Sequence, residues 1–208
     1  MKNKNADNAD LGAEKTAIID IDDEAKQSPE ENGPQKYALL LRVIHWLMAL
    51  CILGLIAVGW YMAGIPKDDP GKYDLYSWHK SFGVLTIFLI VLRIGVRIAT
   101  KVPPLPDGIK KCERRLAKAG HGLLYVGMIL VPVSGYIMSD AGGYSVKFFG
   151  ILMPDFLDKN KDIGSIAHEL HEIVPYVLLA VIALHIAGVI KHKCFDKKSE
   201  NDVLKRMI

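Results

Sequence analysis

Histidine is the residue type in this sequence best suited to cofactor or metal chemistry. Seven are present: His45, His79, His121, His168, His171, His185 and His192. An imidazole can bind a metal, relay a proton or form hydrogen bonds inside a folded protein. Within a membrane it is costly, and it is usually functional when it faces the interior of a helix bundle. The spacing of these histidines therefore indicates which chemistry the chain supports.

His171 and His185 have the most informative spacing, because they are 14 residues apart. At 3.6 residues per turn they return to nearly the same face of a helix, and at 1.5 Å per residue they are separated by roughly 21 Å. Haem iron takes an axial histidine from each side, and a b-type haem needs no covalent attachment. Two ligands on one helix face could thus each hold one haem, stacked across a membrane.

Four long apolar stretches must position these side chains. They cover residues 43–66, 76–98, 119–139 and 173–190. A helix needs about 20 apolar residues to cross the hydrocarbon core, and lipid offers no partners to a non-helical backbone. The soluble alternative, buried core helices, is disfavoured because one small chain holds four such runs. The sequence therefore predicts an all-α membrane protein, a four-transmembrane-helix bundle, with Pro132 and Pro175 kinking two of its helices.

Basic residues indicate how the bundle is oriented. They gather before residue 43, in the loop 93–118 and after residue 190, whereas the other two loops hold few. Because basic loops stay in the cytoplasm, both termini are predicted to be cytoplasmic. Residues 1–35 are polar and nearly free of aromatic residues, which predicts a disordered acidic cytoplasmic tail.

With this orientation, four histidines fall into two pairs by depth. His79 and His171 lie near the outer ends of their helices, and His45 and His185 lie towards the cytoplasm. Bundle cofactor sites are built from side chains on facing helices, so each pair predicts one haem site. A hydrogen-bonded core role explains a lone histidine better than it explains two depth-matched pairs. Residues 36–194 then form a di-haem cytochrome b domain, and residues 195–208 a cytoplasmic C-terminal tail.

The other three histidines leave alternatives open. His121 starts the third helix at the cytoplasmic level, so it rivals His45 as a ligand; it could instead bond a haem propionate or line a quinone pocket. His168 is expected at the outer interface, roughly 100° away from the face of His185. His192 lies between two lysines, which fits either a solvated basic helix end or a role with quinone or protons.

Three arginines lie near the cytoplasmic histidines. Arg42 precedes His45 by three residues, and Arg93 and Arg97 end the second helix. Arginine binds carboxylates through paired hydrogen bonds, so each could hold a haem propionate. Anchoring of the helix ends by positive charge explains each of them equally well.

Composition removes several other classes of protein. The formal net charge of +3 is too small to indicate nucleic-acid binding. Cys51, Cys112 and Cys194 are far apart and form neither a zinc ribbon nor the C-x-x-C-H motif of covalent haem. We expect them to be buried thiols. We expect no cleavable signal peptide, because the first apolar run begins only near residue 38.

At these positions the sequence resembles the bacterial cytochrome b561 family, from about residue 37 to the C-terminus. The matching residues include Arg42, His45, Trp46, Trp78, His79, Lys80, Gly83, Arg93, Arg97, His121, Tyr125, Pro132, Gly135, Phe149, Gly150, Met153, Pro154, His171, Glu172 and His185. The resemblance implies that His45, His79, His171 and His185 are the haem ligands. It also implies a di-haem, quinone-linked electron carrier of the bacterial inner membrane, and some members oxidise superoxide and reduce ubiquinone.

We therefore expect a cytochrome that moves electrons across the membrane to or from quinone, with lipid, quinone and a redox partner protein as its contacts. As an enzyme it would be an oxidoreductase that passes electrons from superoxide to ubiquinone. The alternative is a cytochrome b subunit that anchors a separate dehydrogenase or hydrogenase. A third interpretation, a non-redox transporter with histidine proton relays, would show no haem spectrum.

Overall fold

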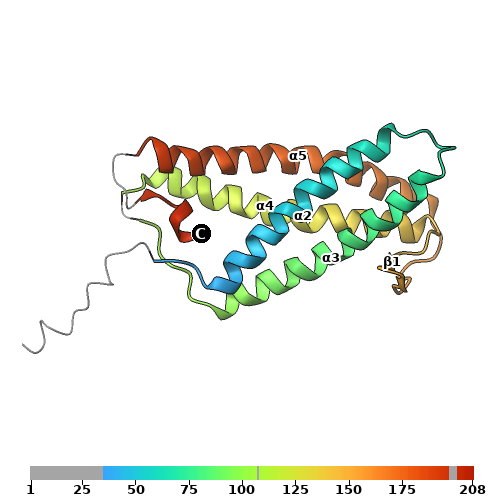
Figure 1. The fold of residues 1–208 in the computed structure, drawn as a ribbon, viewed down its shortest axis with the longest axis horizontal. Coiled ribbons are helices and arrows are strands. Elements are labelled where there is room, and N and C mark those ends of the chain that lie inside the picture. Colours follow the sequence, from blue (N-terminus) through green and yellow to red (C-terminus); the bar gives the residue numbers. More distant parts are fainter. Residues whose placement is uncertain (1–34, 107, 197–200) are drawn as a thin grey trace, which may run out of the picture. The chain divides into compact units, whose positions relative to one another are not determined.

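The computed structural model describes residues 35–106, 108–196 and 201–208, and the unit considered below spans residues 36–208. The tail predicted for residues 1–35 lies outside the described residues, apart from its last one. Four long helices form the unit (Figure 1): α2 Leu39–Gly64, α3 Gly71–Ala99, α4 Lys111–Ala141 and α5 Lys161–Cys194. Each is long and apolar enough to cross a membrane. The prediction of a helical fold with four helices able to span a membrane is therefore confirmed.

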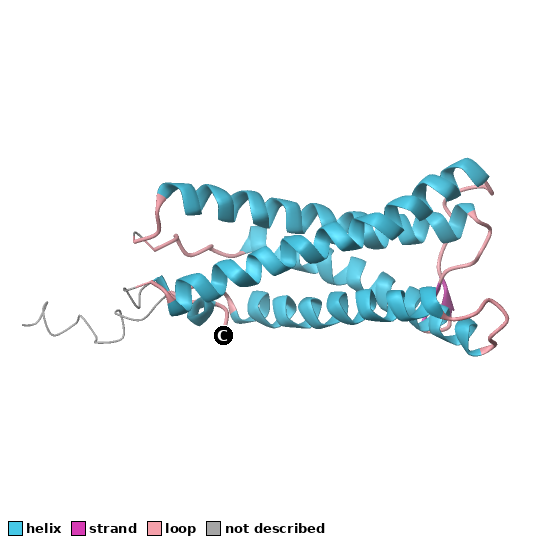
Figure 2. Cartoon of the chain, turned by 90° about the horizontal axis from the view of Figure 1, so that it is seen from above, coloured by secondary structure: helices cyan, strands magenta, loops and turns pink. Residues whose placement is uncertain are grey.

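The helices pack as two pairs that join into a bundle (Figure 2). α4 lies along α5, α2 lies along α3, and α3 also contacts α4. A cluster of buried apolar side chains from α2, α3 and α5 joins them, including Ile44, Met48, Leu89 and Leu178. Many large apolar side chains elsewhere are exposed. The exposure of so many apolar side chains fits a protein surrounded by lipid, because lipid tails accept apolar surface that water does not.

Local sequence explains where these helices begin and end. α2 ends at Gly64, and Ile65 is extended at φ −77° and ψ 134°, as expected of a residue that precedes a proline. α5 begins at Lys161, well before residue 173, because the Asn160 side chain accepts hydrogen bonds from the backbone N–H groups of residues 162 and 163. Pro132 and Pro175 lie inside helices, as predicted.

The α4–α5 connection contains a small hairpin that the sequence analysis did not predict. Strands β1 Lys147–Phe148 and β2 Ile151–Leu152 pair antiparallel. The buried Asp140 carboxylate accepts the backbone N–H groups of Phe156 and Leu157, at 2.9 and 3.0 Å, and fixes the rest of the connection. We call this end of the bundle the hairpin end.

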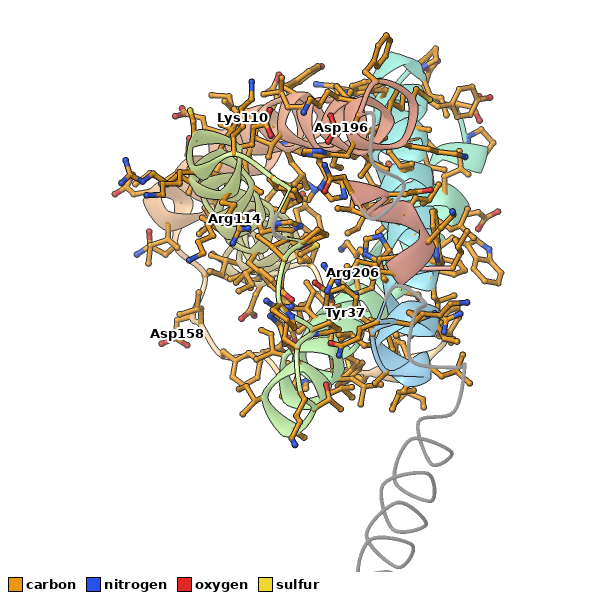
Figure 3. The ribbon with its side chains drawn as sticks, turned by 90° about the vertical axis from the view of Figure 1, so that its left-hand side faces the viewer. Tyr37, Lys110, Arg114, Asp158, Asp196 and Arg206 are labelled. Carbon is orange, nitrogen blue, oxygen red and sulfur yellow. The ribbon has the colours of Figure 1, made fainter. Side chains whose placement is uncertain are left out.

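At the opposite end, which we call the terminal end, residues 201–208 fold back onto the bundle. The segment includes the short helix η3 Leu204–Arg206. The Trp46 indole N–H donates to the Met207 carbonyl at 2.9 Å. The buried Arg206 donates to the Pro104 carbonyl at 2.8 Å and lies 5.6 Å from the Tyr37 ring (Figure 3). These contacts join the start of α2 to the α3–α4 connection.

The expectation of three buried thiols is wrong for two of them. All three cysteines are free, and Cys112 and Cys194 are exposed whereas Cys51 is partly buried. Cys112 lies in the first turn of α4 and Cys194 is the last residue of α5. Both therefore lie at helix ends, where neighbouring helices cover little of the side chain.

Candidate functional site

At the hairpin end, α3 and α5 bring the rings of His79 and His171 together, with the two rings nearly perpendicular. Their ring centres are 6.1 Å apart and the ring planes cross at 86°. The Nδ1–H of His171 donates to the Val131 carbonyl at 2.8 Å, and the Ser134 hydroxyl is 3.4 Å away. A metal-binding histidine typically uses its second ring nitrogen in this way, which fixes the ring and leaves the other nitrogen available.

Glycine makes room for this pair. A Cβ atom added to Gly135 of α4 would lie 2.7 Å from Cε1 of His171, and one added to Gly59 of α2 would lie 3.5 Å from Cε1 of His79. A cavity of about 40 Å³ adjoins His171 and is lined partly by Gly83, Gly135 and Lys80. The backbone of α4 therefore approaches the His171 ring more closely than any other residue type would allow.

At the terminal end, α2 and α5 bring His45 and His185 together. Their ring centres are 6.4 Å apart and the planes cross at 67°. His121 of α4 joins them, with its ring centre 5.3 Å from that of His185. The Nδ1–H of His121 donates to the Ala117 carbonyl at 2.7 Å. His185 thus has two neighbouring histidines, and both alternatives for its partner remain open.

The two pairs can be compared with the spacing that a metal would impose. In zinc sites a histidine nitrogen lies about 2 Å from the metal, and the ring centre is about 1 Å farther, so opposed ligands have ring centres about 6 Å apart. The separations of 6.1 Å and 6.4 Å agree with this value. Nδ1 of His79 is also buried without a hydrogen-bond partner among the described residues. The donor set fits two bis-histidine haem sites.

Comparison with known proteins identifies the family. Residues 36–208 match the prokaryotic cytochrome b561 family. The chain belongs to this family. A relative named cytochrome b561 homolog 2, from Escherichia coli strain K12, is 30% identical over 179 residues, which cover 85% of this chain and 93% of the relative. A probable superoxide oxidase, CybB of Yersinia pestis, is 26% identical over 175 residues, which cover 83% of this chain and 96% of that protein.

Membership has direct consequences for this cytochrome. The family consists of membrane cytochromes that carry electrons and bind b-type haem. The predicted resemblance is therefore confirmed, together with the transmembrane and electron-transport classes that it implied. A multi-pass bacterial membrane protein follows from the family and the four long helices.

The three predicted arginines lie at the terminal end of this cytochrome. Arg93 donates to the Leu41 carbonyl at 3.3 Å and lies close enough to His45, His121 and His185 to act on all three electrostatically. Nε of Arg42 is buried and has no hydrogen-bond partner within the described part of the chain. Arg97 is exposed and acts electrostatically on His121. A guanidinium group has five N–H donors, so all three arginines keep donors for an anionic group.

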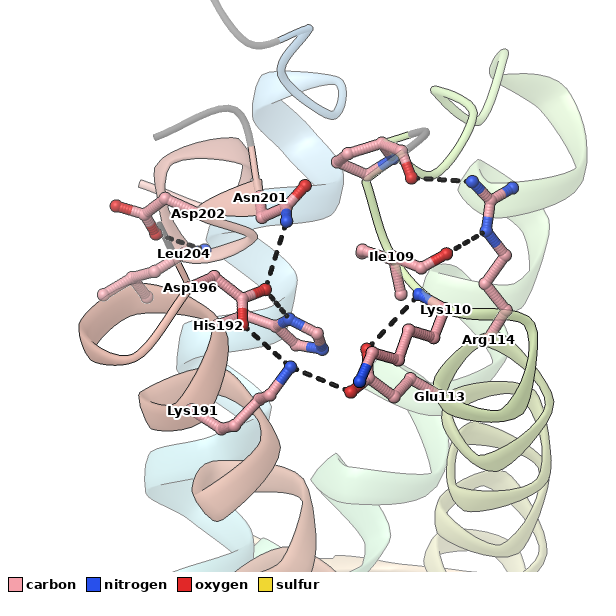
Figure 4. A network of polar contacts seen from close by, with 11 residues as sticks. Ile109, Lys110, Glu113, Arg114, Lys191, His192, Asp196, Asn201, Asp202 and Leu204 are labelled. Atoms are coloured by element: carbon pink, nitrogen blue, oxygen red, sulfur yellow. Dashed lines mark hydrogen bonds and ion pairs between the residues drawn. The ribbon is translucent and has the colours of Figure 1, made fainter. Parts of the chain in front are cut away.

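His192 belongs to a polar network that ties α4 to the end of α5 (Figure 4). Its Nδ1–H donates to Asp196 at 2.8 Å, and its side chain is only 13% exposed, which contradicts the alternative of a solvated basic end. Lys191 bridges Asp196 and Glu113 at 2.8 and 2.9 Å. Hydrogen bonds from Lys191 and then His192 lower the pKa of Asp196 from 3.8 to about 2.

His168 lies at the hairpin end, inside α5 and about one helical turn before His171, and belongs to neither ring pair. It is exposed, and its Nδ1 lies 3.1 Å from the sulfur of Met138. Sequence reasoning missed Ser134, which contacts His171. It named Tyr125 only as a residue of the family resemblance and gave it no role, although the Tyr125 hydroxyl is buried with no hydrogen-bond partner among the described residues. Tyr125 follows His121 by one helical turn. That spacing is the signal by which it could have been recognised as part of the site.

Proposed function

We propose that this chain is a di-haem b cytochrome that transfers electrons across the membrane between an outer-face donor and quinone. His79 and His171 would hold one haem, and His45 and His185 the other. The observation that supports this most directly is the presence of two opposed imidazole pairs at metal-ligand spacing. The pairs are separated by 14 residues of α5, or roughly 21 Å along the bundle.

The haems would supply reversible one-electron transfer. The chain supplies orientation and charge. The Val131 carbonyl holds His171 through its Nδ1–H and makes the opposite nitrogen the available donor. At the terminal end, Arg42 and Arg93 would bind propionate carboxylates, since their guanidinium groups form paired hydrogen bonds with such groups. Arg97 is a third candidate for the same task, and His121 would bond a propionate or line the quinone pocket.

For the substrate, we propose superoxide as electron donor and ubiquinone as acceptor. Two superoxide anions would each give up one electron and become O₂, and ubiquinone would take both electrons with two protons from the cytoplasmic side. The name of the Yersinia pestis relative supports this choice. So does Lys80, which lines the cavity next to His171. Lys72, in contrast, is buried, and its ammonium group donates to the Ile65 carbonyl in the α2–α3 connection. We therefore assign the Lys72 charge to stabilising that connection.

This function places the hairpin end outside and both termini in the cytoplasm of a bacterial inner membrane. Basic residues concentrated at the terminal end support that orientation. If positive charge near the haem attracts the superoxide anion, the reaction should slow as added salt screens that charge. Asp68 and Asp69 in the α2–α3 connection and Asp74 in the first turn of α3 would weaken that attraction. The proposed attraction of superoxide therefore rests on Lys80, which lies next to His171.

The test is stopped-flow mixing of the oxidised, haem-loaded protein with superoxide, with and without ubiquinone, while the haem absorption band is recorded. We expect fast haem reduction that slows at higher ionic strength and in Lys80→Glu. The control is Lys67→Glu, an exposed lysine of the α2–α3 connection outside the cavity, which should change the rate less. Haems that stay oxidised at every salt concentration would reject superoxide and favour a subunit that anchors a dehydrogenase or hydrogenase.

A further inference from the structure

The hairpin Lys147–Leu152 turns through two residues with unusual backbone conformations. Phe149 has φ 48° and Gly150 has φ 92°. Two central residues with positive φ are typical of the type I′ turn of a two-residue hairpin. Glycine adopts such a conformation freely, but a bulky side chain such as phenylalanine does so at a cost. The position of the Phe149 ring must therefore be fixed by its surroundings.

Those surroundings belong to α3. The Phe149 ring contacts Trp78 and Phe82, with ring centres 5.9 and 5.4 Å apart. The Phe149 backbone N–H donates to the Ser81 hydroxyl at 3.1 Å. The single proton of that hydroxyl is shared between the Ser77 carbonyl at 2.9 Å and the Lys147 carbonyl at 3.1 Å. The hairpin is thus bonded to one turn of α3 through its first strand and the first residue of its bend, which fixes its depth along that helix.

That depth lies within the apolar part of α3. Phe148 contacts Phe88, with ring centres 5.6 Å apart. Phe88 lies within the uncharged run 81–92, seven residues beyond Ser81. Seven residues correspond to about 10 Å along a helix. A helical side chain points back towards the N-terminus, so the Phe88 ring lies about one turn, or 5 Å, short of its own Cα. The Phe148 ring therefore reaches at least about 5 Å past Ser81, which is the depth to which interfacial elements enter the boundary between headgroups and acyl chains.

The exposed side chains of strand β2 are apolar, since Ile151 is 67% exposed and Leu152 62% exposed. Phe88 of α3, which Phe148 contacts, is also exposed, and so is Val91 less than one turn farther along that helix. Lys147 pairs with Leu152 across the strands, and a lysine at a membrane boundary can extend its ammonium group to the headgroups while its stem stays in the apolar layer. Acyl chains that cover α3 at this level would cover the hairpin as well.

We propose that the hairpin Lys147–Leu152 is inserted into the lipid leaflet at its end of the bundle and is covered there by acyl chains. This part of the connection between α4 and α5 is then a membrane element, with Ser81 setting how deeply it enters. The insertion does not depend on the identity of the haem ligands or of the electron donor, because it rests on the transmembrane helices and the hairpin contacts alone.

The test compares introduced cysteines in the haem-loaded protein in phosphatidylethanolamine–phosphatidylglycerol vesicles. The background carries the substitutions Cys51→Ala, Cys112→Ser and Cys194→Ser. Ile151→Cys is compared with Val91→Cys in α3 and Asp158→Cys in the exposed connection. An apolar environment suppresses the reactive thiolate, so we expect a water-soluble maleimide to react with residue 151 at least about tenfold more slowly than with residue 158. A rate equal to that of residue 158 would overturn the proposal.

A second arm separates lipid from a protein cover. A phospholipid with a photoactivatable diazirine in its acyl chain should label the hairpin peptide and the α3 peptide around Val91, but not the peptide around Asp158, as mapped by mass spectrometry. Slow maleimide reaction without photolabelling would mean that a second copy or another protein covers the hairpin, and the proposal would fail. An unchanged haem spectrum for Ile151→Cys confirms that the variant is folded.

Discussion

At the hairpin end, His171 faces one other imidazole among the described residues, that of His79, whereas at the terminal end His185 has both His45 and His121 as neighbours. The surroundings differ as well. The Val131 carbonyl of α4 fixes the His171 ring, and Gly135 of the same helix leaves room for it. The three histidines at the terminal end lie near Arg93 instead. The hairpin end thus holds one histidine pair, and the terminal end combines a histidine pair with further polar groups.

The comparison explains a division of labour. A site that only receives electrons needs two fixed imidazoles, but a site that passes them to quinone must also supply protons and bind a polar head group. If the proposed function is correct, a third histidine and nearby cations at the terminal end would meet that additional need. The following predictions test whether the two levels differ in this way.

The largest expected effect is the loss of an entire haem. His171→Ala should remove the hairpin-end haem and leave the other low-spin, because each haem needs both axial histidines. A pyridine haemochrome assay should then show about half of the wild-type haem per chain. Acidified acetone should strip haem from the wild type, since no C-x-x-C-H motif is present. One haem per wild-type chain, or covalently retained haem, would contradict the two-site arrangement.

The next prediction distinguishes the two partners of His185. The 6.4 Å separation from His45 matches opposed ligation better than the 5.3 Å separation from His121. We therefore expect His45→Ala to abolish the terminal low-spin signal in electron paramagnetic resonance, and His121→Ala to leave both irons six-coordinate while it slows quinone reduction. The reverse result would assign the ligand to α4.

A smaller effect is expected from filling the space next to His171. In Gly135→Ala the added Cβ would lie 2.7 Å from Cε1 and 2.9 Å from Nδ1 of His171. The ring must move, so we expect weaker binding of the hairpin-end haem and a shifted low-spin signal there, with the terminal signal unchanged.

The control for this substitution is Gly122→Ala on the same helix, where an added Cβ meets no atom within 4 Å. Replacing glycine by alanine within a helix is favourable by about 1 kcal/mol when space allows. Gly122→Ala should therefore keep both haems and unfold at an equal or higher temperature. If Gly135→Ala behaves identically, the close approach of α4 to His171 has no role in ligation.

The sequence allowed the helices and the two histidine levels to be predicted, because hydropathy and helical periodicity are local properties. The paired positions of His79 with His171 and of His45 with His185 followed from depth alone, and the structure brings both pairs together. The hairpin contacts could not be predicted. The hydrogen bond from Ser81 to Lys147 spans 66 residues, and that from Trp46 to Met207 spans 161. Such contacts depend on the assembled bundle and leave no periodic pattern in the sequence.

The smallest expected effect concerns the network at the terminal end. Lys191 and His192 lower the pKa of Asp196 from 3.8 to about 2, so the folded protein favours its ionised form. A carboxyl group with a lowered pKa stabilises the fold fully above its unfolded pKa, and this contribution is lost as the pH falls through the folded value. Asp196→Asn should therefore lower the unfolding temperature slightly at pH 7. The effect should be small because Lys191 is 42% exposed and solvent screens the pair.

The pH dependence of that difference is the decisive measurement. Thermal unfolding of wild type and Asp196→Asn in detergent should give a constant gap from pH 7 down to about pH 4, and the gap should narrow between pH 3.8 and about 2, as the carboxylate becomes protonated. Asp158→Asn, an exposed carboxylate of the α4–α5 connection, provides the matched control and should show no gap at pH 7. A gap for Asp196→Asn that does not change with pH would mean that the side chain acts through packing rather than charge. The network would then hold α5 against α4 without an electrostatic contribution from Asp196.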